Sequence, residues 1–171
     1  MTASIPVLSL ARWSTGSASE RHAFASELCH ICHHIGFLQV VDHGIDPALH
    51  DRHFAMIDAF FALPEDVKAT IDKQRSRHFR GWERVGAELT DHRVDHREQL
   101  DLSTEHTPVA FDATPAYLRL DGPNQWLADD VLPGFRTTVL EVVDRWRAVA
   151  DTLMAAMSVG LGLAPDHLAQ V

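Results

Sequence analysis

Apolar residues near the N-terminus follow first a strand pattern and then a helix pattern. Residues 5–10, IPVLSL, are a short apolar run with β-branched members, which is typical of a strand. After the turn-forming segment STGSAS, apolar residues recur at helical spacing and predict an amphipathic helix over residues 19–34. Ser17 and Glu20 have the spacing of a capping box at its start, and Gly36 can take the positive φ that ends a helix.

A second strand and two further helices are predicted next. The segment FLQVVDHG, residues 37–44, is rich in β-branched and aromatic types and predicts a strand. Asp46 and Pro47 are typical of a helix start, with Asp as N-cap and Pro at the first helical position. The apolar side of that helix is expected to consist of Leu49, Phe54, Ile57, Phe60 and Phe61. A short helix is predicted within residues 64–71, because acidic side chains in its first turn suit the helix dipole.

For the second half of the chain, the sequence pattern predicts extended segments, loops and one long helix. Residues 78–102 have weak strand character, and residues 104–130 are rich in Pro, Asp and Gly, which indicates an ordered loop. The expected anchors of this loop are Tyr117, Leu118, Leu120 and Trp126. A long helix is expected to open at Pro133, with an apolar face of Phe135, Val139, Val142, Trp146, Val149, Leu153 and Met157. About four predicted strands are too few for a closed barrel, so the pattern predicts a mixed, helix-rich fold.

Length and composition favour one cytoplasmic domain over residues 1–171. Apolar residues make up 46% and charged residues 23% of the chain, the balance of an ordinary globular domain with a core. No stretch approaches the roughly 20 apolar residues of a membrane span, and the N-terminus does not resemble a secretory signal. Two cysteines cannot build a disulfide framework, which favours an intracellular location. The formal net charge of −9 argues against nucleic acid or an anionic membrane as the main partner.

The most metal-like stretch is CHICHH, residues 29–34. Structural zinc usually takes four ligands from two separated pairs, and the chain has no second C-x-x-C. His30 and His34 are one turn apart and can share an ion, but Cys29 and Cys32 flank the apolar helix face, where cysteine packs as a small hydrophobe. A redox pair normally lies at a helix N-terminus, whereas this pair lies near a C-terminal end. We interpret the stretch as packing, and a small zinc or thiol protein that uses Cys29, Cys32 and His34 is the alternative.

One pattern suits non-haem iron, for which two histidines and a carboxylate form a facial triad. His96 and Glu98 form an H-x-E in a segment of strand character, where side chains two apart share a face. The histidines downstream are His106 and His167. A chance H-x-E is expected among 12 histidines, so His96 and Glu98 are outside candidates and no metal ligand is predicted. The sequence contains no nucleophile elbow, P-loop or dinucleotide-binding fingerprint.

Several segments, taken in order, resemble one family. They are IPVLSL, IGFLQVVDHGI (35–45), FFALPEDVK (60–68), RGWERVGAELTDHRVDHREQLDL (80–102), GPNQW (122–126), LPGFR (132–136) and GLGL (160–163). With these segments the chain resembles the N-terminal region of the isopenicillin N synthase-like Fe(II)/2-oxoglutarate-dependent dioxygenases. The resemblance covers essentially the whole chain. It departs from the family at Leu38, where an aromatic residue is usual, and at Asp42, where asparagine is usual.

The resemblance implies where the chemistry of such an enzyme lies. In this family a double-stranded β-helix, or jelly roll, follows the N-terminal region and carries a His-x-Asp…His iron site and an Arg-x-Ser for the 2-oxoglutarate carboxylate. This chain has no His-x-Asp, and no Arg-x-Ser after residue 102. We therefore expect an α+β, helix-rich N-terminal region with most of the jelly roll absent. The implied parent is an oxidoreductase that uses Fe(II) and 2-oxoglutarate on a small molecule, whereas this chain alone is predicted to have no catalytic residue, no bound cofactor and no activity.

Substrate contacts are the contribution that the resemblance implies for this chain. The segment HFRGWERVG matches the region where family members contact substrate, and the candidates there are Arg80, Trp82, Glu83 and Arg84. Arg80 or Arg84 could pair a substrate carboxylate in a bidentate geometry. In the alternative interpretation, these residues shape a turn and pair with Glu88 or Asp91.

A second class of function also stays open, a non-catalytic binding or assembly module derived from such an oxygenase. Half of a domain leaves apolar surface where the other half packs, and such a patch marks an interaction site. The long helix around Trp146 is the expected face, so self-association is predicted alongside a small-molecule substrate.

Overall fold

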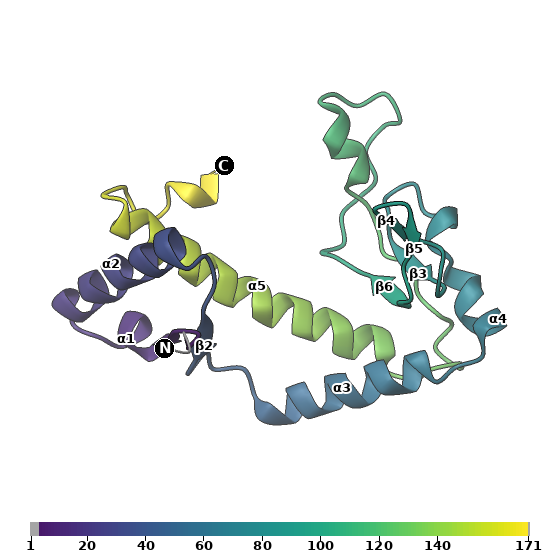
Figure 1. The fold of residues 1–171 in the computed structure, drawn as a ribbon, viewed down its shortest axis with the longest axis horizontal. Coiled ribbons are helices and arrows are strands. Elements are labelled where there is room, and N and C mark those ends of the chain that lie inside the picture. Colours follow the sequence, from purple (N-terminus) through teal and green to yellow (C-terminus); the bar gives the residue numbers. More distant parts are fainter. Residues whose placement is uncertain (1–3, 171) are drawn as a thin grey trace. The chain divides into compact units, whose positions relative to one another are not determined.

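The computed structural model describes residues 4–170 (Figure 1). Its α-helices are α1 (Ala11–Ser14), α2 (Ala18–His34), α3 (Pro47–Phe61), α4 (Glu65–Lys68) and α5 (Phe135–Gly160). Its strands are β1 (Val7–Ser9), β2 (Gln39–Val41), β3 (Gly81–Glu83), β4 (Leu89–Thr90), β5 (Arg93–Val94) and β6 (Gln99–Asp101). Its 3-10 turns are η1 (Ala69–Ile71), η2 (Lys73–Arg75), η3 (Ala116–Leu120) and η4 (Leu168–Gln170). None of the helices within residues 4–170 is both long enough and apolar enough to cross a lipid bilayer.

The chain forms two compact units. Unit 1 joins the residues up to Asp46 with those from Arg145 onward, and unit 2 is Pro47–Asp144. The division falls within α5, so this helix supplies its first turns to unit 2 and its last turns to unit 1. The single domain over residues 1–171 stays a prediction.

Unit 1 contains α2, whose ends are set by local residues. The Ser17 hydroxyl accepts a hydrogen bond from the Glu20 backbone N–H at 3.3 Å, and the Glu20 carboxylate accepts one from the Ser17 N–H at 2.7 Å. These two bonds complete the predicted capping box. Beyond the helix, Gly36 has φ +90°, a conformation that a side chain disfavours. The helix predicted over residues 19–34 is confirmed to within one residue.

The core of unit 1 joins side chains of α2, the β1–β2 pair and the last turns of α5. Strands β1 and β2 run parallel, with Leu8 opposite Val40, and the connection between them contains α2. The buried core residues are Leu8, Leu10, Phe24, Leu28, Ile31, Val149 and Ala156. Three of the apolar residues predicted for α2, Phe24, Leu28 and Ile31, therefore form its buried face. The fourth, Ile35, is exposed because it lies just beyond the end of the helix.

Unit 2 has its own core, which joins α3, the β3–β6 pair and the first turns of α5. Strands β3 and β6 run antiparallel, with Trp82 opposite Leu100, and β4 and β5 form a separate hairpin. The rings of Phe60 and Phe135 stack with their centroids 5.3 Å apart. The buried core residues are Phe60, Ile71, Trp82, Leu127, Phe135 and Val139. This core holds β3 in place, and β3 carries part of the candidate site.

The prediction that certain apolar side chains are buried is wrong, because these side chains face solvent. Phe54 is 53% exposed, since it lies five positions after the buried Leu49 and so about 140° around the helix from it. Tyr117 and Leu120 are also exposed, because they lie in η3, a 3-10 turn too short to bury a continuous face. Trp126, predicted to anchor the same loop, does pack against the unit 2 core.

Strand content and helix boundaries also differ from the prediction. Residues 4–170 contain six strands instead of about four, because the hairpin of β4 and β5 consists of two-residue strands. Its turn residues Asp91 and His92 both have positive φ, which hairpins usually achieve with Asn-Gly, so the sequence carries no signal for it. The long helix begins at Phe135 rather than Pro133.

Candidate functional site

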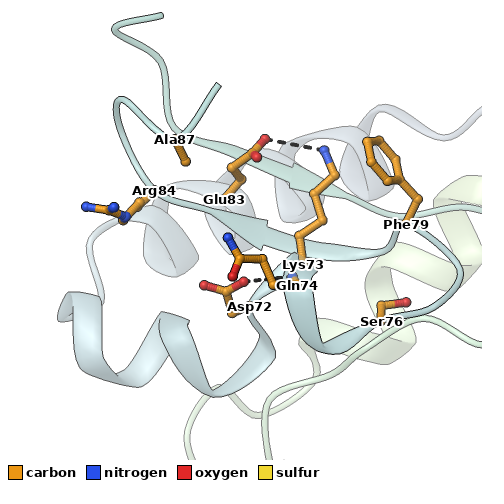
Figure 2. Close-up of a pocket in the computed structure, with 8 residues that line it drawn as sticks. All are labelled: Asp72, Lys73, Gln74, Ser76, Phe79, Glu83, Arg84 and Ala87. Carbon is orange, nitrogen blue, oxygen red and sulfur yellow. Dashed lines mark hydrogen bonds and ion pairs between the residues drawn. The ribbon is translucent and has the colours of Figure 1, made fainter. Parts of the chain in front are cut away.

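The candidate site is a cavity of about 250 Å³ in unit 2 (Figure 2). Its walls come from η2, from the loop that follows η2, and from the end of β3 and the residues after it. The lining residues are Asp72, Lys73, Gln74, Ser76, Phe79, Glu83, Arg84 and Ala87. The cavity therefore combines both signs of charge with one aromatic ring.

A buried cation, Lys73, lines this cavity. Its side chain is 7% exposed, and its ammonium lies 2.6 Å from an Asp101 oxygen and 3.3 Å from a Glu83 oxygen. The same nitrogen lies 3.8 Å from the centre of the Phe79 ring, and Figure 2 shows it between that ring and Glu83. Burial acts to lower the pKa of Lys73, but hydrogen bonds and charges of Asp101 and then Glu83 outweigh it and raise that pKa above its usual value. Lys73 therefore stays charged and orients both carboxylates.

The pairing of β3 with β6 brings the two carboxylates together. Glu83 lies opposite Gln99, and Asp101 follows two residues later on β6. The Gln99 side-chain amide donates to Glu83 at 2.7 Å and to Asp101 at 3.2 Å. Since side chains two apart in a strand share a face, Gln99 and Asp101 lie on the face opposite to Leu100, which packs against the core. Glu83 is thus oriented by two donors, Lys73 and Gln99.

The loop before β3 holds Phe79 in a left-handed conformation. Phe79 has φ +59°, which is strained for an aromatic residue, and its ring is 61% exposed. Gly81 has φ +123°, and a Cβ there would lie 2.3 Å from the Ile71 carbonyl oxygen. The Gln125 side-chain amide donates to the Arg80 carbonyl at 2.8 Å. These contacts fix the loop so that the ring stays at the cavity.

Two of the predicted substrate residues, Trp82 and Arg80, do not line the cavity. Trp82 is 2% exposed because it alternates with Glu83 along β3 and points into the core, where its indole N–H donates to Glu98 at 2.6 Å. The Arg80 guanidinium donates to the His78 carbonyl at 2.8 Å, while its Nε is buried without a partner. The structure places the other two predicted residues on the cavity wall. Substrate binding by any of the four stays a prediction.

Arg84 is a cation on the cavity wall without an acidic partner. In the part of the chain that the structure describes, no carboxylate lies within ion-pair distance of its guanidinium. Glu88, one of the two turn partners considered from the sequence, pairs with Arg97 instead. The guanidinium is therefore available to an anionic group of a ligand.

Glu98, the carboxylate of the H-x-E pattern, belongs to a structural ion pair. It lies 2.5 Å from the ammonium of the buried Lys68 and also accepts the Trp82 indole N–H. Loss of Glu98 would leave the Lys68 charge buried, with the Phe61 carbonyl, 2.9 Å away, as the remaining acceptor among the described residues. His96 is exposed. Across residues 4–170, no three His, Cys, Asp or Glu side chains are grouped so that they could hold a metal ion, so these residues do not fit an iron site.

The stretch that contains Cys29 and Cys32 lies in unit 1. Both are free, half-buried thiols. Cys32 packs against the core of unit 1, which confirms the packing interpretation for this residue. The exposed rings of His30 and His34 lie 4.2 Å apart between centroids.

The sequence did not identify Lys73, Phe79, Gln99 or Asp101 as site residues. The segment KQRSR, which begins at Lys73, has the composition of a solvated surface run. The usable signal was the alternation of Gln99 and Asp101 with two leucines, which indicates a strand with one polar face. The residues that contact this face, Lys73 and Glu83, lie far away along the chain, and no local pattern reveals them.

Comparison with protein families and curated proteins gives consistent matches. The family model described as non-haem dioxygenase in morphine synthesis N-terminal matches residues 5–129. The 2-oxoglutarate-dependent dioxygenase frbJ of Dothideomycetidae sp. (strain 11243) is 36% identical over 95% of this chain and 43% of that protein. The chain thus spans a little under half the length of this relative.

Solved structures share the fold. A full-length Neurospora crassa protein, solved in complex with alpha-KG, matches with a TM-score of 0.76 at 22% identity, over 95% of this chain and 49% of that chain. A putative 2OG-Fe(II) oxygenase family protein from Caulobacter crescentus matches with a TM-score of 0.75 at 24% identity, over 96% of this chain and 51% of that chain. At such identities the likeness is one of fold.

Proposed function

Since this chain belongs to the non-haem, 2-oxoglutarate-dependent dioxygenase family, whose N-terminal region it represents, we propose that it forms the N-terminal portion of an oxidoreductase that acts on a small molecule. The family implies Fe(II) and 2-oxoglutarate as cofactors. Because the described residues group no metal ligands, we infer that other residues hold the iron and that this chain does not turn over by itself. A cytoplasmic location is part of the same proposal.

The unit 2 cavity is the observation that supports a role of this chain toward substrate. The cavity is lined by Arg84, the oriented Glu83 carboxylate and the exposed ring of Phe79, and Figure 2 shows Arg84 on the opposite side of Glu83 from that ring. Lys73 is already paired with two carboxylates, so Arg84 is the cation left for a ligand. A few fixed polar groups beside an apolar surface are typical of a small-molecule site. This arrangement suits a ligand with an anionic group and a planar apolar part.

The proposed inactivity of the isolated chain is tested by its turnover of 2-oxoglutarate. With Fe(II) and ascorbate, we expect the purified chain to form no succinate above a metal-free control, because such turnover needs an iron with fixed ligands and open positions. Succinate above that control would overturn the expectation. The variants His96→Gln and Glu98→Gln would then show whether the H-x-E pattern holds the iron.

The proposed role of Arg84 is tested with an aromatic carboxylate as probe. We expect Arg84→Gln to weaken the binding of benzoate about tenfold, because the amide keeps hydrogen bonds but loses the charge and the planar fork. Saturation-transfer NMR on the purified chain measures this. Arg21→Gln makes the same charge change at an exposed position of unit 1 and serves as control. Equal binding by wild type and Arg84→Gln would remove Arg84 from the proposed site.

A further inference from the structure

A second cavity, of about 280 Å³ in unit 1, has two cysteines and a methionine among its lining residues. It is lined by Cys29, Cys32, His33, Met157 and Leu161. We propose that this cavity binds a soft metal ion, with Cu(I) as its probe, through the thiolates of Cys29 and Cys32 and the thioether of Met157. The proposal concerns a site that the proposed oxygenase function does not use.

The two thiols are neighbours on one turn of α2. Side chains three positions apart on a helix lie on the same side, and both Cys29 and Cys32 are free and half-buried. Both of them line the same cavity, so one ion there can be reached by both thiols.

The last turns of α5 close the cavity from the other side. The Cys29 sulfur lies 3.7 Å from the Met157 carbonyl oxygen, and a Cβ at Gly160 would lie 2.5 Å from the same sulfur. The close approach of the two helices at Gly160 therefore holds the Cys29 thiol against α5. Met157 lies one turn before Gly160 and lines the same cavity.

The donor set selects a soft ion over zinc. Structural zinc takes four ligands, and residues 4–170 contain no suitable group of three His, Cys, Asp or Glu side chains. Thiolates and thioethers are preferred ligands of Cu(I), which is satisfied by fewer donors than zinc. Binding follows Cu⁺ + 2 R–SH → [Cu(SR)₂]⁻ + 2 H⁺, so both protons go to solvent and no electron is transferred. Because the thiols must lose protons, we expect the affinity to rise with pH.

The test is an anaerobic competition between the reduced full chain, free of any purification tag, and the Cu(I) chelator bicinchoninate. We expect the chain to withdraw one equivalent of Cu(I). Cys29→Ser and Cys32→Ser should each lower the affinity at least about tenfold, and Met157→Leu should lower it less, since a thioether is the weaker ligand. The double variant His30→Gln/His34→Gln removes the exposed imidazole pair on the same helix and should keep wild-type affinity.

Two results would overturn the proposal. One is that the wild-type chain withdraws no Cu(I), as expected if the sulfurs only pack. The other is that both cysteine variants bind as the wild type does. If a serine variant fails to fold, alkylation of the wild type decides the matter without any substitution: Cu(I) should protect both Cys29 and Cys32 from iodoacetamide, and equal labelling with and without Cu(I) rejects the site.

Discussion

A single carboxylate, Glu105, links a long loop of unit 2 to the start of α5. It accepts the Trp126 indole N–H at 2.7 Å and a guanidinium N–H of Arg136 at 3.0 Å. Partial burial acts to raise the pKa of Glu105, but the hydrogen bonds from Trp126 and then Arg136 outweigh it, so that pKa lies below its ordinary value of 4.5. The charged form of this residue therefore stabilises the folded state.

The contribution of Glu105 should depend on pH. We expect Glu105→Gln to lower the free energy of unfolding by about 1 kcal/mol at neutral pH, a modest cost because the side chain is 26% exposed. The stabilisation is fully present above the ordinary pKa of 4.5 and is lost as pH falls through the lowered pKa of the folded state. Urea unfolding in neutral and acidic buffers should show the gap between wild type and variant closing in acid. The exposed control Asp151→Asn should show no such closing, and a gap that persists in strong acid contradicts the assignment.

Helix α2 owes its start to two side chains, the N-cap Ser17 and Glu20 in the first turn. Because the Ser17 hydroxyl accepts an otherwise unpaired backbone N–H, we expect Ser17→Ala to lower the free energy of unfolding by about 1 kcal/mol. Ser19→Ala, two residues later and also exposed, is the matched control and should change stability little. Thermal and urea unfolding measure both variants. Equal losses for the two would show that the capping box does not set the helix start.

Elements whose ends are determined by neighbouring residues could be predicted from the sequence, and elements that depend on residues far away along the chain could not. The start of α2 follows from Ser17 and Glu20, and the start of α3 follows from Pro47, because capping and proline geometry act within one turn. The β4–β5 hairpin was missed because its turn residues carry no glycine or asparagine. In the candidate site, Glu83 and Arg84 were named from the resemblance. Lys73 was missed because its role depends on pairing with β6, which is remote in sequence.

For the chain as a whole, the comparisons confirm the predicted family and fold class, a helix-rich N-terminal region of a jelly-roll oxygenase. Large apolar side chains are exposed in both units; they include Phe37 and Trp146 in unit 1 and Phe54 and Phe111 in unit 2. Trp146, predicted on the apolar face of the long helix, is 43% exposed and contacts only His43 among aromatic residues described, with 5.2 Å between ring centroids. Such surface favours association with another apolar surface.

Self-association of the purified chain is the expected consequence. We expect light scattering to give a molar mass above that of a monomer, rising with concentration. Trp146→Glu should lower it, because a charge there must be desolvated on association, whereas Arg147→Gln changes an exposed neighbour on the same helix and should not. A monomer at every concentration would argue for a self-sufficient fold.

The surroundings of Trp82 have a practical consequence for optical measurements. This indole is shielded from water and hydrogen-bonded to a carboxylate in unit 2, whereas the indole of Trp146 in unit 1 is partly open to solvent. Indole fluorescence shifts to longer wavelength in polar surroundings, so Trp146 is expected to emit at longer wavelength than Trp82. Soluble quenchers will reach Trp146 first. Each unit contains two of the four tryptophans, with Trp13 and Trp146 in unit 1 and Trp82 and Trp126 in unit 2. Variants that keep only Trp82 or only Trp146 would therefore report the loosening of one unit without any added dye.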